Sequence, residues 1–177
     1  IGEAHGLGRE AVDVVFTTAP MHDVGKIGIP DAILMKPGRL DATEWKVMEQ
    51  HPVMGAEIIG RHDNDLLETA RIISLTHHER WDGSGYPARL KGEEIPLPGR
   101  IAAIADVFDA LVSVRSYKQA YSVEHSLSIM DSEDGRQFDP PLMQAFRKAL
   151  PEILRIKDIY ADERGALTDL DVARAPS

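Results

Sequence analysis

The feature that most constrains the fold of this chain is the regular spacing of its histidine and aspartate side chains. These side chains occur at four places in the sequence, and the gaps are 29 residues from His22 to His51, 26 from His51 to His77 and 28 from His78 to Asp106. Each gap is long enough for one helix and the connection to the next. A helical domain could therefore bring ligands from successive helices to a common centre. The candidate metal ligands are His22, Asp23, His51, His77, His78 and Asp106.

Hydrophobic periodicity predicts that the chain folds into helices alone. The clearest helix is expected over Arg100–Val112, where Ile101, Ile104 and Phe108 recur at intervals of three and four residues. No segment of useful length shows the strict alternation of a half-buried strand. We therefore predict an all-α fold, a single helical domain with a metal site between its helices. Further helices are expected to begin at the capping residues Asp41, Asn64 and Ser122.

Prolines and one tryptophan give narrower predictions about individual helices. Pro20 is expected in the first turn of a helix that Gly25 ends or loosens. Trp45 is expected to face inward on its short helix. Pro151 is expected to start a last helix, separate from the one that opens at Asp139-Pro140.

The length of the chain predicts one domain. A chain of 177 residues can bury a hydrophobic core of its own. We place the domain at residues 1–160 and expect residues 161–177, which lack clear periodicity, to form a polar tail. The chain begins at Ile1 without an initiator methionine, so we interpret it as part of a longer protein.

Composition excludes several classes of function. There is no cysteine, so disulfides and thiolate metal sites are excluded, and any metal must bind to nitrogen and oxygen ligands. A net charge of −9 argues against binding a nucleic-acid polymer, which requires a basic face. No apolar run reaches the length of a membrane span, and no signal-peptide pattern is present. We expect a cytoplasmic protein.

The adjacent pair His77-His78 favours a site with two metal ions. Neighbouring side chains at a helix end point about 100° apart, so each imidazole could reach a different ion. The alternative, two histidines at a solvated helix end, is as common for such a pair alone. His51 could likewise be a helix-capping side chain. Asp106 lies among apolar residues, where an unpaired carboxylate would be costly and a metal would remove that cost.

The loop after this pair carries the most specific motif of the chain. Gly83 and Gly85 allow a tight turn, and Tyr86-Pro87 adds an aromatic ring with a polar tip. Together with His22-Asp23 and His77-His78-Glu79, this Gly-Tyr-Pro segment resembles the HD-GYP family of cyclic di-GMP phosphodiesterases. The resemblance covers about residues 7–150 and extends to Asp31, Arg100, Asp109, Arg115, Tyr117-Lys118 and Phe138-Asp139-Pro140.

The resemblance implies a role for each site residue. Asp23 would bridge two metal ions and, with Lys26, would be catalytic. The substrate would be bound by Lys26, Tyr86, Arg115 and Lys118. The cofactors would be two or three divalent ions, Fe or Mn first and otherwise Ni, Zn or Mg. Members of the family place a further ligand-bearing helix upstream, which would lie before Ile1. Ser116 stands where the family usually has proline. The metal ligands would be His22, Asp23, His51, His77, His78 and Asp106.

The function implied by the resemblance is hydrolysis of cyclic di-GMP to linear pGpG, and continuation to GMP is left open. Partners would be cyclic di-GMP and an N-terminal sensor or receiver domain outside this chain. Three alternatives stay open: another cyclic dinucleotide such as a mixed GMP-AMP ring, another nucleotide substrate of the wider HD group, or a silent module that binds a dinucleotide or a protein. A helical scaffold without metal is the remaining structural alternative.

Overall fold

The chain is almost entirely helical. The computed structural model describes residues 1–113 and 120–172, the last thirteen of these by their backbone alone. Within these ranges there is no β-strand, only an isolated bridge between Asp134 and Phe138. The elements are α1 (Gly2–His5), α2 (Arg9–Thr18), the 3-10 helix η1 (Ala19–Gly28), α3 (Asp31–Leu34), α4 (Ala42–Met48), α5 (His51–Ile59), α6 (Asp65–Thr76), the 3-10 helix η2 (Gly92–Glu94), α7 (Leu97–Val112), α8 (Val123–Ser132) and α9 (Pro140–Val172).

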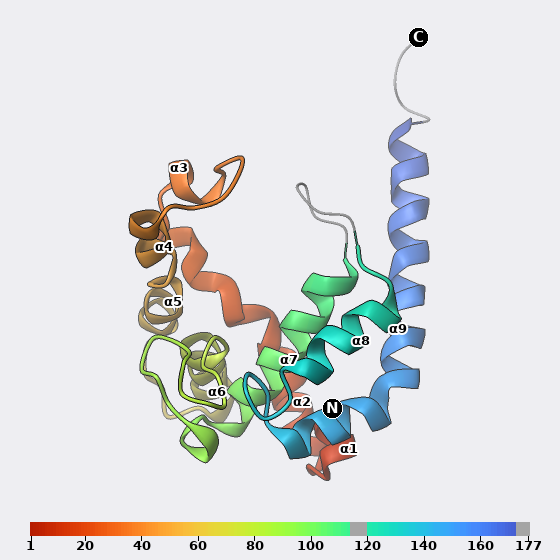
Figure 1. Cartoon of the computed structure of the whole chain (residues 1–177), viewed down its shortest axis with the longest axis horizontal. Coiled ribbons are helices and arrows are strands. Elements are labelled where there is room, and N and C mark those ends of the chain that lie inside the picture. The colour runs from red at the N-terminus through yellow and green to blue at the C-terminus, as the bar shows by residue number, and fades with distance from the viewer. Residues whose placement is uncertain (114–119, 173–177) are drawn as a thin grey trace.

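The helices form two groups that meet along α6 and α7. Figure 1 shows α3, α4, α5 and α6 on one side and α7, α8 and α9 on the other. The 3-10 helix η1 packs on α5 and α6, and α6 also contacts α2 and α7. Four elements, η1, α2, α5 and α7, therefore pack around α6, the helix that leads into His77 and His78.

The hydrophobic core lies on the α7 side. The predicted stripe of Ile101, Ile104 and Phe108 is buried there, as expected. The Phe108 ring meets the ring of Phe146 from α9 edge to face, with 5.2 Å between centroids. Burying such large side chains contributes roughly 1.5–3 kcal/mol each. This packing anchors α7, which carries Asp106 on another face.

The three predicted N-caps are confirmed. The Asn64 side chain accepts hydrogen bonds from the N–H groups of Leu66 and Leu67 at the start of α6. Asp41 forms a full capping box with Glu44 on α4. The Ser122 hydroxyl accepts a hydrogen bond from the His125 N–H on α8. Each cap satisfies N–H groups that have no partner inside the helix.

The segment after Pro20 differs from the prediction. It forms a 3-10 helix that starts at Ala19 and continues through Gly25 to Gly28. Gly25 is buried against α5, where an added Cβ would lie 1.9 Å from the His51 carbonyl oxygen and 2.4 Å from the Gly55 nitrogen. The glycine therefore permits close backbone packing and does not end the helix.

Two further expectations were wrong. Trp45 is 48% exposed, because α4 packs mainly on the short α3 at the edge of the molecule. Pro151 lies inside α9, which runs from Pro140 to Val172, so it does not start a separate helix. The backbone of residues 161–172, within the expected polar tail, continues this helix. Alanine, leucine, glutamate and arginine in that stretch favour a helix. Figure 1 shows α9 bending part-way along, as expected where proline removes a backbone hydrogen bond.

None of the helices among the described residues is long and apolar enough to cross a membrane.

Candidate metal centre

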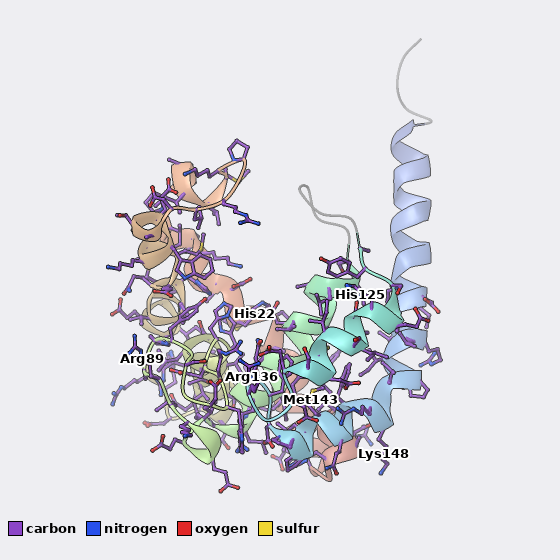
Figure 2. All side chains as sticks on the ribbon, in the orientation of Figure 1. His22, Arg89, His125, Arg136, Met143 and Lys148 are labelled. Carbon is purple, nitrogen blue, oxygen red and sulfur yellow. The ribbon has the colours of Figure 1, made fainter. Side chains whose placement is uncertain are left out.

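His22 and Asp23 lie on the 3-10 helix η1. Nδ1 of His22 donates a hydrogen bond to the Ala19 carbonyl oxygen at 2.8 Å, which turns Nε2 the other way. That Nε2 lies 3.3 Å from Oδ2 of Asp23 and 3.7 Å from Oδ1 of Asp106 on α7. Figure 2 shows His22 between the two groups of helices. His22 therefore connects η1 to α7.

His51 and His77 are buried and aim at the same carboxylate. Nδ1 of His51 donates to the Met48 carbonyl oxygen at 2.7 Å, and Nδ1 of His77 to the Ser74 carbonyl oxygen at 2.9 Å. Their Nε2 atoms lie 3.4 Å apart, and 3.4 and 3.8 Å from Oδ1 of Asp23. With both Nδ1 atoms protonated, each neutral ring presents a lone pair at Nε2. Two lone pairs and a carboxylate oxygen thus face one point.

The Asp23 carboxylate shows that a cation fits this point. Its Oδ1 is buried and has no hydrogen-bond partner among the described residues. Its Oδ2 accepts a hydrogen bond from the Lys26 ammonium at 2.5 Å. A buried carboxylate oxygen left without a partner is costly, and neighbouring imidazole nitrogens that present lone pairs cannot relieve the cost. A divalent ion between them would satisfy all these acceptors at once.

His78 completes the group. One ligand atom from each of Asp23, His51, His77 and His78 can be chosen so that all four lie within 4.8 Å of one another. The Tyr86 ring stacks on the His78 imidazole, with 4.8 Å between centroids and 24° between planes. The tyrosine loop therefore forms one wall of the candidate metal centre.

The pKa values favour metal binding. Burial lowers the pKa of His77 to about 4 and that of His78 to about 2, and it also lowers the pKa of His51. These rings are neutral at pH 7, the form in which histidine binds a metal. Burial alone would raise the pKa of Asp23, but hydrogen bonds from His22 and Lys26 hold it well below its usual value. The same contact with Asp23 raises the pKa of His22.

The structure brings four of the predicted ligands, Asp23, His51, His77 and His78, into one cluster. His22 lies beside Asp23, and Asp106 lies beside His22 at the edge of the cluster. The alternative of His51 as a capping side chain is wrong, because Gln50 is the N-cap and the His51 ring is buried beside His77. Arg115 and Lys118 lie outside the described residues. Sequence reasoning gave no role to Glu79, which is buried next to His78. The sequence feature that could have indicated a role for Glu79 is its position directly after His77-His78.

Comparison with known proteins identifies the family. A family model described as an HD domain matches residues 1–142. This chain belongs to the HD domain family. The match includes all six residues of the candidate metal centre.

Named relatives of this HD domain are phosphodiesterases. It is 49% identical to a cyclic di-GMP phosphodiesterase of Vibrio cholerae over 85% of its length, and 44% identical to a cyclic di-GMP phosphodiesterase response regulator of Xanthomonas campestris over 88%. It covers 32% and 41% of those proteins, so it spans between about a third and two fifths of their length. These relatives confirm the expected resemblance to the HD-GYP phosphodiesterases.

A solved structure confirms the fold. The crystal structure of a cyclic GMP-AMP specific phosphodiesterase of Vibrio cholerae matches this HD domain with a TM-score of 0.60 and 21% identity. The match covers 85% of this chain and 41% of that one. The all-helical HD fold is therefore shared with that enzyme.

Proposed function

We propose that this HD domain is a metal-dependent phosphodiesterase that hydrolyses cyclic di-GMP to linear pGpG, with GMP as a further product to be tested. The observation that carries the proposal is the buried Oδ1 of Asp23, which faces the Nε2 atoms of His51 and His77 without a hydrogen-bond partner among the described residues. The names of the relatives supply the substrate class.

Six side chains would hold two divalent ions, with Fe and Mn preferred and Ni, Zn or Mg as alternatives. Asp23 would bridge the ions, because its two oxygens face different partners. When bound, such ions lower the pKa of a water molecule and neutralise charge on phosphate oxygens. The six proposed ligands are His22, Asp23, His51, His77, His78 and Asp106.

The remaining site residues would position and neutralise the substrate. The Lys26 ammonium lies beside Asp23 and is partly exposed, so it can meet a non-bridging phosphate oxygen. The Tyr86 ring offers a face for a guanine base or a hydroxyl for a phosphate. Arg115 and Lys118 would add a forked donor and a mobile charge for the phosphates.

A mixed GMP-AMP ring is the second candidate substrate, because a Vibrio cholerae relative that is 45% identical over 92% of this chain is named a 3'3'-cGAMP-specific phosphodiesterase. The silent binding module is disfavoured, since every ligand position that the resemblance places in this chain is filled. We further propose an N-terminal sensor or receiver domain, supported by the greater length of the relatives and by the response regulator among them.

Product analysis tests the proposal. Protein loaded with Mn²⁺ or Fe²⁺ is incubated with cyclic di-GMP or the mixed ring, and we expect linear pGpG from cyclic di-GMP. Asp23→Ala should abolish turnover and lower the metal content measured by elemental analysis. The matched control is Asp13→Ala, whose side chain is 70% exposed on α2. Metal-loaded protein that binds the dinucleotide in a calorimeter but forms no product would contradict the proposal.

A further inference from the structure

The Glu79 side chain is buried shortly after the end of α6 and is not one of the candidate metal ligands. It is 3% exposed. Oε1 accepts a hydrogen bond from the Ala88 N–H at 2.7 Å, and Oε2 accepts one from the Leu90 N–H at 3.1 Å. Both donors belong to the far end of the loop that begins at Arg80. The carboxylate therefore connects the end of this loop, through two hydrogen bonds, to the segment that carries His77 and His78.

The start of the same loop is held by different contacts. The Trp81 N–H donates to the Gln137 carbonyl oxygen at 3.1 Å, and the Asp82 N–H to the Arg136 carbonyl oxygen at 2.8 Å. The segment before α9 thus fixes the entry of the loop, and Glu79 fixes its exit. Between these two anchors lies Tyr86.

Tyr86 lies between the two anchored ends of the loop and contacts His78. Its N–H donates to the His78 carbonyl oxygen at 3.2 Å, and its ring stacks on the His78 ring. At Gly85 an added Cβ would lie 2.4 Å from the Arg80 nitrogen and 2.6 Å from the His78 carbonyl oxygen. The loop backbone is therefore in direct contact with the chain that carries His78.

We propose that Glu79 is a positioning residue that keeps the Tyr86 ring on His78, at the wall of the metal centre. This inference rests on the proposed function for its kinetic consequences, whereas the anchoring of the loop is a property of the chain alone. Without the carboxylate, the N–H groups of Ala88 and Leu90 lose their acceptor within the protein, so the exit of the loop separates from α6. Tyr86 then no longer has a fixed position toward the substrate.

The first test measures the loop directly, by amide hydrogen exchange of residues 83–90 in the 177-residue chain. Glu79→Gln preserves size but replaces one acceptor oxygen with an amide NH2 group, which can only donate. We expect about tenfold faster exchange in this segment, the size expected for the loss of one hydrogen bond. The control is Glu94→Gln, an exposed carboxylate that accepts from the Lys91 N–H in the same loop. Unchanged exchange in Glu79→Gln, or equal acceleration in the control, would overturn the proposal.

The second test is a double-mutant cycle with Tyr86→Ala, read as kcat/KM for cyclic di-GMP. If Glu79 acts through Tyr86, Glu79→Gln lowers kcat/KM about tenfold in the parent protein and has no further effect beside Tyr86→Ala. The metal content should stay unchanged. An equal loss in both backgrounds would show that Glu79 supports the fold generally and would overturn the positioning role.

The two tests separate the two proposals. If no variant and no parent protein turns over the dinucleotide, the proposed function fails while the exchange result still decides the role of Glu79. Should Glu79→Gln fail to fold, Glu79→Asp is measured in its place, because it keeps the charge and shortens the side chain by one methylene. Faster exchange at residues 83–90 is expected there also, and wild-type exchange would overturn the proposal.

Discussion

At the scale of single residues, three of the candidate ligands are oriented by backbone carbonyl groups that lie close to them in the sequence. His22, His51 and His77 each donate Nδ1–H to the carbonyl oxygen three residues earlier. Each Nε2 is therefore aimed by a backbone contact close in the sequence, and a hydrogen-bonded second nitrogen also makes an imidazole a better metal ligand. The carboxylate of Asp23 needs no such orientation, because Lys26 holds one of its oxygens.

Lys26→Ala should reduce kcat/KM while leaving the metals in place. Removing one charge-stabilising donor costs roughly 2–4 kcal/mol in comparable sites. The matched control is Lys36→Ala, since the Lys36 ammonium lies 2.5 Å from Glu44 on α4, away from the metal centre. Elemental analysis would accompany the kinetics. If Lys26→Ala loses its metals, the ammonium maintains Asp23 and does not act on the substrate.

The free energy of unfolding of the metal-stripped chain should decrease as the pH falls below about 6.5. The folded-state pKa of His77 is lowered to about 4, so between these values the unfolded chain binds a proton that the folded chain does not. One such proton changes the stability by up to about 1.4 kcal/mol per pH unit. His51 and His78 act in the same direction, and His22 opposes them.

Urea denaturation between pH 7.5 and 5 measures this dependence. His77→Gln should flatten the slope, because it removes one of the groups that titrate. His125→Gln is the control, since its side chain is exposed on α8. A slope that His77→Gln leaves intact would show that other groups cause the loss of stability in acid.

At the scale of elements, two glycines set the distance between η1, α5 and α6. Gly25 of η1 lies against the α5 backbone, and an added Cβ at Gly55 of α5 would lie 2.2 Å from the Ser74 hydroxyl of α6. These three elements carry His22, Asp23 and His51 and lead into His77. The ligands can therefore meet only because the backbones approach this closely.

Gly25→Ala should separate η1 from α5 and reduce metal content together with turnover. The added methyl group would lie 1.9 Å from a backbone oxygen, so the helices themselves must shift. Gly8→Ala is the control, because nothing lies within 4 Å of its added Cβ. Elemental analysis and thermal denaturation of both variants decide the outcome. Metal content equal to the parent in Gly25→Ala would contradict the role assigned to this contact.

At the scale of the whole molecule, sequence reasoning could predict the features that depend only on residues close together in the sequence. The caps, the α7 stripe and the ligand residues carry their own signals in spacing and residue type. Sequence reasoning failed where contacts with residues far away in the sequence determine the local structure. Gly25 looked like the end of a helix because its close neighbour, the His51 carbonyl, lies 26 residues later. Trp45 and Pro151 were misplaced because their surroundings depend on how far the neighbouring elements extend.

Because the ligands come from separate elements, metal binding should stabilise the whole fold. An ion that binds only the folded chain at about 100 times its Kd adds roughly 2.7 kcal/mol. For a chain of this length, each kcal/mol raises the Tm by about 2–4 °C. Thermal denaturation with Mn²⁺ should therefore show a Tm about 5–10 °C above that with EDTA. Asp23→Ala should lose this difference and Asp13→Ala should keep it. An equal Mn²⁺ effect in Asp23→Ala would mean that the ion binds elsewhere on the chain, since the orphan carboxylate oxygen is the atom that links η1 to α5 and to the end of α6.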